Sequence, residues 1–195
     1  MSSRVQYLTY MRSAQVTHVN CYVAKALING DGVAQDSVLA VEWYEKAAAR
    51  GCALSQYDLG EKYFYGKGVD QDFERAVAEY RLAAEEEGEG GGHSAAQMSL
   101  GFCYYHGHEV EKDDIIAREW YKKAALQGNP AGVYNAAQMC RDGEGGELDY
   151  KDAARMFRQL AEHGHGQAQN HLGHMYHKGE GVAQDGTQAV AWFIK

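Results

Sequence analysis

The sequence predicts an all-α fold in which antiparallel helix pairs repeat along the chain, an α-solenoid. Three observations predict it: a glycine-rich motif recurs at a near-constant interval, apolar residues between the motifs follow helical spacing, and 23 glycines accompany a single proline. That ratio suits many short helices that end at glycine. With 195 residues, of which 45% are hydrophobic, the chain can bury a continuous core.

The repeated motif is Gly-x-Gly-Val or a variant of it. Successive motifs start 36 residues apart, with one interval of 41. An aspartate follows each motif, and an alanine lies four residues beyond each aspartate. The motifs begin at Gly30, Gly66, Gly107, Gly143 and Gly179, and the aspartates are Asp36, Asp72, Asp113, Asp149 and Asp185. The long interval contains the acidic, glycine-rich segment 85–92, which we interpret as a solvated insertion in a connection, with an acidic tether for a basic partner as the alternative.

The residue pattern within each repeat predicts two helices, and residues 52–88 show this pattern clearly. Apolar and small residues at helical spacing predict a first helix over 53–65. Gly66 is expected to end that helix, because glycine enters the left-handed region without a side-chain clash. The carboxylate of Asp72 then suits the N-cap of a second helix, which is expected to run to about Glu87.

Helix boundaries and close contacts are also marked in other repeats. Asn129 and Pro130 predict a helix start, because proline at the first helical position loses no hydrogen bond. Three repeats place a glycine directly after a leucine inside the first helix, at a cost of about 1 kcal/mol relative to alanine. We interpret these glycines as points of close helix approach, with an aromatic residue of the second helix filling the space between hairpins. The glycines are Gly60, Gly101 and Gly173, and the expected aromatics are Trp43, Tyr80, Trp120, Phe157 and Trp192.

The combined pattern A-x-x-x-L-G-x-x-Y-x-x-G-x-G-V-x-x-D-x-x-x-A-x-x-W-Y-x-K-A-A-x-x-G, found across residues 14–195, resembles the Sel1-like repeat family. The resemblance implies a right-handed superhelix of antiparallel helix pairs, related to tetratricopeptide arrays. It also implies an adaptor or scaffold that holds other proteins. On this pattern residues 1–195 form a single Sel1-like repeat domain, with units at about 14–51, 52–88, 93–128, 129–164 and 165–195.

Both ends of the repeat array depart from the pattern. The last unit stops at Lys195 inside its second helix, whereas solenoids normally end in a polar capping helix. We therefore expect Ala189, Trp192 and Phe193 to be exposed and the chain to be a piece of a longer protein, with end-to-end association as the alternative. Residues 1–13 are expected to form either a short preceding helix or a fragment of one.

The resemblance further implies that the first helix of each repeat lines a concave face. This row combines aromatic rings with polar groups, a composition typical of peptide-binding grooves. The alternative is that several of these rings pack between helices. The candidate partner-binding residues are Tyr57, Glu61, Phe64, Tyr65, Met98, Phe102, Tyr105, Tyr134, Gln138, Arg141 and His174, and the same row also contains His106, Asn135 and Asp142.

Five histidines lie between positions 163 and 177. On a helix His171 and His174 would be one turn apart, the spacing of two ligands to one metal ion. No cysteine or carboxylate accompanies them at ligand spacing, so we predict no metal and interpret the histidines as a solvated or partner-facing, pH-sensitive patch. A metal-dependent or hydrolytic enzyme that uses this cluster remains the alternative function, and a structural spacer inside a longer chain is another.

Catalytic motifs are absent from the sequence. It contains no G-x-S-x-G, S-x-x-K or H-E-x-x-H motif, so we predict that the protein is not an enzyme and needs no cofactor. The four cysteines fall at different phases of the repeat without a C-x-x-C spacing, which favours free thiols over disulfides. No small-molecule substrate is expected.

The net charge of -8, from 27 acidic and 19 basic residues, argues against a nucleic-acid or anionic membrane partner, since both attract clustered Lys and Arg. No apolar run is long enough to span a membrane, and the N-terminus has no signal-peptide core. The expectation is a cytoplasmic protein that binds a protein or peptide.

Overall fold

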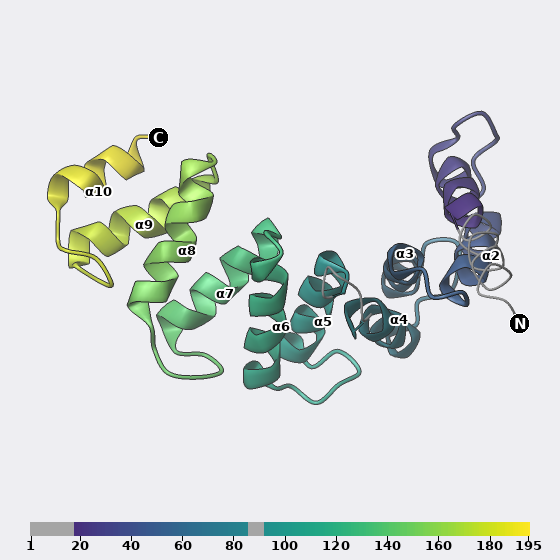
Figure 1. The fold of residues 1–195 in the computed structure, drawn as a ribbon, viewed down its shortest axis with the longest axis horizontal. Coiled ribbons are helices and arrows are strands. Elements are labelled where there is room, and N and C mark those ends of the chain that lie inside the picture. The colour runs from purple at the N-terminus through teal and green to yellow at the C-terminus, as the bar shows by residue number, and fades with distance from the viewer. Residues whose placement is uncertain (1–17, 86–91) are drawn as a thin grey trace, which may run out of the picture. The chain divides into compact units, whose positions relative to one another are not determined.

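The computed structural model describes residues 18–85 and 92–195, and every regular element in these two ranges is a helix (Figure 1). The all-α prediction is therefore confirmed. The chain divides into two compact units, of which the first ends at Ala96 and the second begins at Gln97. Outside the described residues lie the expected helix or fragment over 1–13, the start of the first unit at 14–17, and the body of the acidic insertion at 86–91.

The first unit is built from successive helices that pack on their neighbours in sequence. Residues 18–29 are helical, and they are followed by α2 (Ser37–Ala48), α3 (Ala53–Tyr65) and α4 (Phe73–Glu85). α3 packs against both α2 and α4. Its bounds agree with the helix predicted over 53–65, whereas the predicted end of the second helix near position 87 lies outside the described residues.

The second unit contains five complete helices and most of a sixth. α5 (Ser94–His106) contributes its residues from Gln97 onward, and α6 (Asp114–Leu126), α7 (Pro130–Asp142), α8 (Tyr150–Glu162), α9 (Gly166–Lys178) and α10 (Gly186–Phe193) follow. From α6 to α10 each helix packs against the next one in sequence, as the green-to-yellow part of Figure 1 shows. Their facing sides form one apolar core, which includes Val133, Phe157, Leu172 and Met175.

The repeated aspartates and glycines act as helix caps, as the motif predicted. The Asp113 carboxylate accepts the backbone amides of Ile115 and Ile116 at 2.9 and 3.0 Å, which satisfies two donors that the first turn leaves without helical partners. Asn129 caps α7 in the same way, with Pro130 at the first helical position. At the other end of α7, Gly143 has a φ of 73°, a left-handed conformation that ends the helix.

The glycines inside the first helices lie against aromatic rings of the second helices. A Cβ atom added to Gly60 would lie 2.7 Å from the Tyr80 ring, as predicted. At Gly101 the ring belongs to Tyr121, so the predicted Trp120 is wrong for this contact by one residue. The reason is helical spacing: Tyr121 lies four residues after Ala117, whose carbonyl also faces Gly101, and therefore shares its side of α6. Likewise Phe193, rather than Trp192, covers Gly173.

The second glycine of the Gly-x-Gly motif marks another close approach, between one repeat and the repeat before it. Gly145 has a φ of +66°, and a Cβ atom there would lie 2.0 Å from the carbonyl oxygen of Asp114, the first residue of α6. Gly68 meets the carbonyl of Ser37, the first residue of α2, in the same manner. This contact holds the start of a second helix against the loop of the following repeat. The third such pair is Gly181 with Tyr150.

Two residues of the last repeat are buried where exposure was expected. Ala189 and Trp192 are 2% and 8% exposed, because α10 packs against α9. Phe193, by contrast, is 45% exposed, in agreement with the prediction. The Lys195 ammonium lies over the Trp192 ring, 3.7 Å from its centre.

None of the four cysteines forms a disulfide, as the sequence predicted. In the described ranges no helix is long and apolar enough to cross a membrane.

Candidate functional site

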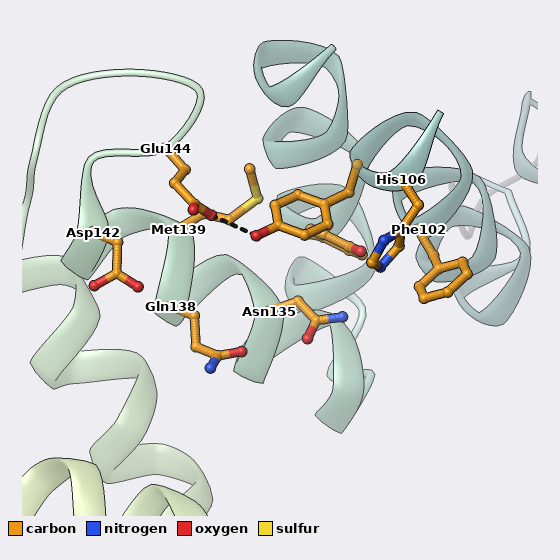
Figure 2. A pocket seen from close by; sticks show the side chains of 9 residues that line it. Phe102, His106, Asn135, Gln138, Met139, Asp142 and Glu144 are labelled. Atoms are coloured by element: carbon orange, nitrogen blue, oxygen red, sulfur yellow. Dashed lines mark hydrogen bonds between the residues drawn. The ribbon is translucent and has the colours of Figure 1, made fainter. Parts of the chain in front are cut away.

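A cavity of about 370 Å³ lies between α5 and α7 in the second unit (Figure 2). Its residues come from three consecutive helices and from the loop that follows α7. It brings together three of the predicted partner-binding residues, Phe102, Tyr105 and Gln138. The lining consists of Phe102, Tyr105 and His106 from α5, Tyr121 from α6, Asn135, Gln138, Met139 and Asp142 from α7, and Glu144 from the loop.

Helical spacing explains why these side chains meet. Phe102, Tyr105 and His106 are three and four residues apart on α5 and therefore share one face of that helix. Asn135, Gln138 and Asp142 have the same spacing on α7. The cavity is thus a meeting of two helix faces, with polar groups from α7 opposite aromatic rings from α5.

The Glu144 carboxylate closes one side of the cavity. Its Oε2 accepts a hydrogen bond of 3.0 Å from the Tyr105 hydroxyl, drawn as a dashed line in Figure 2. This bond raises the pKa of Tyr105, and burial adds to the effect, as do the negative charges of Glu144, Asp114 and Asp142. The Glu144 carboxylate therefore gives this side of the cavity acidic character.

The loop that carries Glu144 is held from behind by Arg118. This largely buried side chain donates from Nη1 to the carbonyl oxygens of Glu147 at 3.1 Å and Glu144 at 3.5 Å. Its Nη2 atom lies 3.1 Å from the Cys140 sulfur. The guanidinium therefore fixes the loop backbone, and through it the position of the Glu144 side chain.

Tyr121 forms the buried part of the lining. Burial raises the pKa of its hydroxyl, and the charge of Tyr105 raises this pKa further. A hydrogen bond with Asn135 acts in the opposite direction and lowers it. Because its ring also covers Gly101, this tyrosine joins the packing of the hairpin to the cavity.

Tyr134 and Arg141, also predicted to bind a partner, are instead joined in a network with His171. The Tyr134 hydroxyl lies 3.1 Å from Nε2 of His171, and Nη1 of Arg141 lies 2.9 Å from Nδ1. Arg141 also donates from Nε to the Asp142 carboxylate at 2.7 Å. Since a guanidinium can only donate, Nδ1 must accept and Nε2 carries the proton of a neutral imidazole.

These contacts leave neither ring nitrogen of His171 open to a metal ion, and they place a cation beside one of them. His174 is exposed, and its ring packs edge-on against Phe193 at 5.0 Å. Within residues 18–85 and 92–195 no group of three or more His, Cys, Asp or Glu side chains is arranged to hold a metal ion. The geometry of His171 and His174 therefore does not support a metal site.

The neutral state of His171 makes stability depend on pH. Burial lowers the pKa of His171 below its usual value of 6.5, and the Arg141 charge lowers it further. As the pH falls, His171 therefore takes up a proton in the unfolded chain at a higher pH than in the folded chain. The contribution of neutral His171 to the free energy of unfolding is thus fully present above about pH 6.5 and is lost as the pH drops below that value. We expect the urea midpoint, followed by circular dichroism, to decrease between pH 7.5 and 5.5, and to decrease less in a His171→Gln variant. A matched His177→Gln variant, which changes an exposed histidine of the same helix, should retain the wild-type slope; equal slopes in all three proteins would contradict the assignment.

The candidate residues of the first unit mostly pack within that unit. The Tyr57 ring lies 4.8 Å from that of His93, and Phe64 lies 5.0 Å from Phe73. The Glu61 carboxylate accepts a hydrogen bond of 2.6 Å from the hydroxyl of Tyr80. Tyr65 is 57% exposed and has the Lys67 ammonium 5.2 Å from its ring centre. Met98, in the second unit, packs against the apolar core of that unit.

Three lining residues were not among the predicted ones: Tyr121, Met139 and Glu144. Glu144 lies between the two glycines of the motif, a position that carries Asp31, Lys67, His108 and Glu180 in the other repeats. Variation at a fixed position of the repeated motif was the available signal. The contact back to Tyr105 of the preceding repeat was not visible, because it depends on how the loop folds.

The family model for the Sel1 repeat matches residues 19–52, 53–88, 94–129, 130–165 and 166–195. The chain belongs to the Sel1 repeat family. Members of this family are generally scaffolds for protein interactions and are typically not enzymes.

Solved structures share the Sel1 repeat fold. The chain is 39% identical to c5321, a protective antigen present in uropathogenic Escherichia coli strains that displays an SLR fold, with a TM-score of 0.84; the match covers 91% of this chain and 37% of that one. A Sel1 repeat protein from Oxalobacter formigenes is 30% identical with a TM-score of 0.84, over 97% of this chain and 77% of that one. The immunity protein Pa5087 from Pseudomonas aeruginosa, at 19% identity and a TM-score of 0.54, covers 90% and 63% and shares the fold alone. The chain thus spans little more than a third of the length of c5321.

Proposed function

We propose that this chain is an interaction module that binds a peptide segment of a partner protein over α5 and α7 of the second unit. The observation that carries the proposal is the cavity whose lining combines aromatic rings, amide side chains and carboxylates. Membership of a family of interaction scaffolds supports the same class of function.

The lining has the chemistry that peptide recognition requires. Phe102 and Tyr105 are half-buried rings with few rotatable bonds, so their contact with a partner loses little conformational entropy. The amides of Asn135 and Gln138 can each donate and accept, which suits the N–H and C=O groups of a peptide backbone. Tyr134 and Arg141 are engaged with His171 and Asp142, so in this proposal they hold α7 against α9 and contact the partner only at its edge.

The test is a selection from a random peptide display library on the purified chain. We expect clones that bind the wild type and bind a Phe102→Ala, Gln138→Ala double variant about tenfold more weakly, since truncating an anchor residue and its polar neighbour removes the centre of the contact. A Leu126→Ala variant, which truncates an exposed apolar side chain at the end of α6 outside the cavity, should bind like the wild type.

Two results would overturn the proposal. One is a selection that yields no specific binder, which a structural spacer predicts. The other is a set of binders that the double variant retains at full affinity, which would place the binding surface elsewhere.

A further inference from the structure

We infer that the cavity between α5 and α7 takes an arginine side chain presented by the partner. This inference rests on the proposed function and names the partner's chemistry. Its starting point is the charge of the lining, which contains the carboxylates of Asp142 and Glu144 and no lysine or arginine. The rings of Phe102 and Tyr105 also line the cavity, and aromatic faces attract cations.

Glu144 is the carboxylate that a partner's cation would meet. Asp142 is already paired with Arg141, whereas no ion pair of the described residues includes Glu144. The Tyr105 hydroxyl donates to Oε2 of Glu144 as a neutral group and brings no positive charge to it. Acidic lining and neutral donors together favour a ligand that brings positive charge.

The cations near the cavity are committed to other groups. Arg118 donates to backbone carbonyls and to the Cys140 sulfur behind the loop. Lys112 lies 5.5 Å from the centre of the Tyr105 ring, and its ammonium bonds to the Asp114 carboxylate at 3.1 Å. Neither side chain lines the cavity.

The next repeat carries an arginine at one of the positions that correspond to the cavity lining. The motif spacing of 36 residues makes Arg141 equivalent to Tyr105, His171 to Asn135, and Glu180 to Glu144. There the Arg141 guanidinium donates to His171, and its pKa is raised first by its hydrogen bond to Asp142 and further by charges that include Glu180. The chain itself thus places a guanidinium among the residues that correspond to the cavity lining.

Shape and size favour arginine over other ligands. A volume of about 370 Å³ lies at the small end of ligand pockets, which suits one long side chain rather than a larger molecule. Arginine stacks its planar guanidinium on aromatic rings and bonds a carboxylate with two parallel N–H groups. In this position it would lie against the aromatic rings of α5 and donate to the Glu144 carboxylate.

The test is an NMR titration of the isotope-labelled chain with acetyl-arginine-amide and with acetyl-citrulline-amide, its neutral analogue of nearly equal shape. We expect the arginine probe to shift amide signals of the cavity residues and the citrulline probe to bind about tenfold more weakly, since hydrogen bonds to charged partners are the stronger ones. Glu144→Gln should weaken the arginine probe by a similar factor. Glu147→Gln, which removes an acid of the same loop that does not line the cavity, should leave it unchanged.

Equal binding of the two probes would overturn the inference without any variant, so a Glu144→Gln protein that fails to fold does not rescue it. The display selection separates the two proposals. In the selected peptides each arginine is replaced in turn by citrulline. If peptides bind over the cavity and none of these replacements weakens binding, the interaction module stands and the arginine pocket is overturned. If instead the selection yields no binder but the cavity still prefers the arginine probe to the citrulline probe, the interaction module is overturned and the cation preference of the cavity stands.

Discussion

A Gly145→Ala variant is expected to unfold with a free energy about 3 kcal/mol lower than the wild type, because it adds overpacking to a left-handed backbone. Gly145 has a φ of +66°, which disfavours any residue with a side chain. Its added methyl group would also lie 2.0 Å from the carbonyl oxygen of Asp114, part of the rigid first turn of α6. The loop and α6 would have to separate, and this would loosen the support of Glu144.

The matched control is Gly128→Ala. Gly128 has a φ of +76°, yet no atom lies within 4 Å of an added Cβ. This variant therefore isolates the backbone strain, about 1–2 kcal/mol. Urea denaturation followed by circular dichroism gives both values. Equal losses in the two variants would show that the contact with Asp114 has no energetic importance.

A Phe157→Ala variant is expected to destabilise the second unit by about 3–5 kcal/mol, the usual effect of truncating a fully buried aromatic side chain. Phe157 is 0% exposed, and its ring lies 4.8 Å from the ring of His171 and 5.9 Å from that of Tyr134. The change would therefore remove core contacts, and it would also remove the aromatic ring against which His171 and Tyr134 pack. The same denaturation measurement tests it.

The control for this variant is Ile115→Ala, which truncates an apolar side chain that is 61% exposed. It should lower the free energy of unfolding by less than about 1 kcal/mol. If Phe157→Ala were as mild as Ile115→Ala, the apolar core would not be packed around Phe157 as described.

The sequence was sufficient for the helices because their boundaries depend on local chemistry. Asp113 and Asn129 cap their helices through amides two or three residues away, and Gly143 ends α7 through its own φ. Such contacts follow from residue type and spacing alone. For the contact with Gly101 the prediction gave Trp120 in place of Tyr121. The two neighbouring residues are both aromatic, and only the rotation of α6 about its axis decides which ring faces Gly101.

The candidate site was predictable only in part, for a related reason. Phe102, Tyr105 and Gln138 lie on regular helix faces, and periodicity placed them on the partner-binding row. The position of Glu144 depends on a loop whose backbone Arg118 holds from the preceding repeat. The bond between Arg141 and His171 joins side chains 30 residues apart, and pairings of that kind are set by packing and not by a pattern in the sequence.

The contact between Gly145 and Asp114 has a consequence for how a chain of this kind changes its length in evolution. The glycine and the carbonyl it meets belong to successive repeats, and the same pairing occurs between Gly181 and Tyr150. Deleting or duplicating a 36-residue segment within residues 110–195, wherever the crossover falls, joins one repeat's loop to the helix start of another copy and so restores the pair. Recombination in this region can therefore lengthen or shorten the array without creating an unmatched junction.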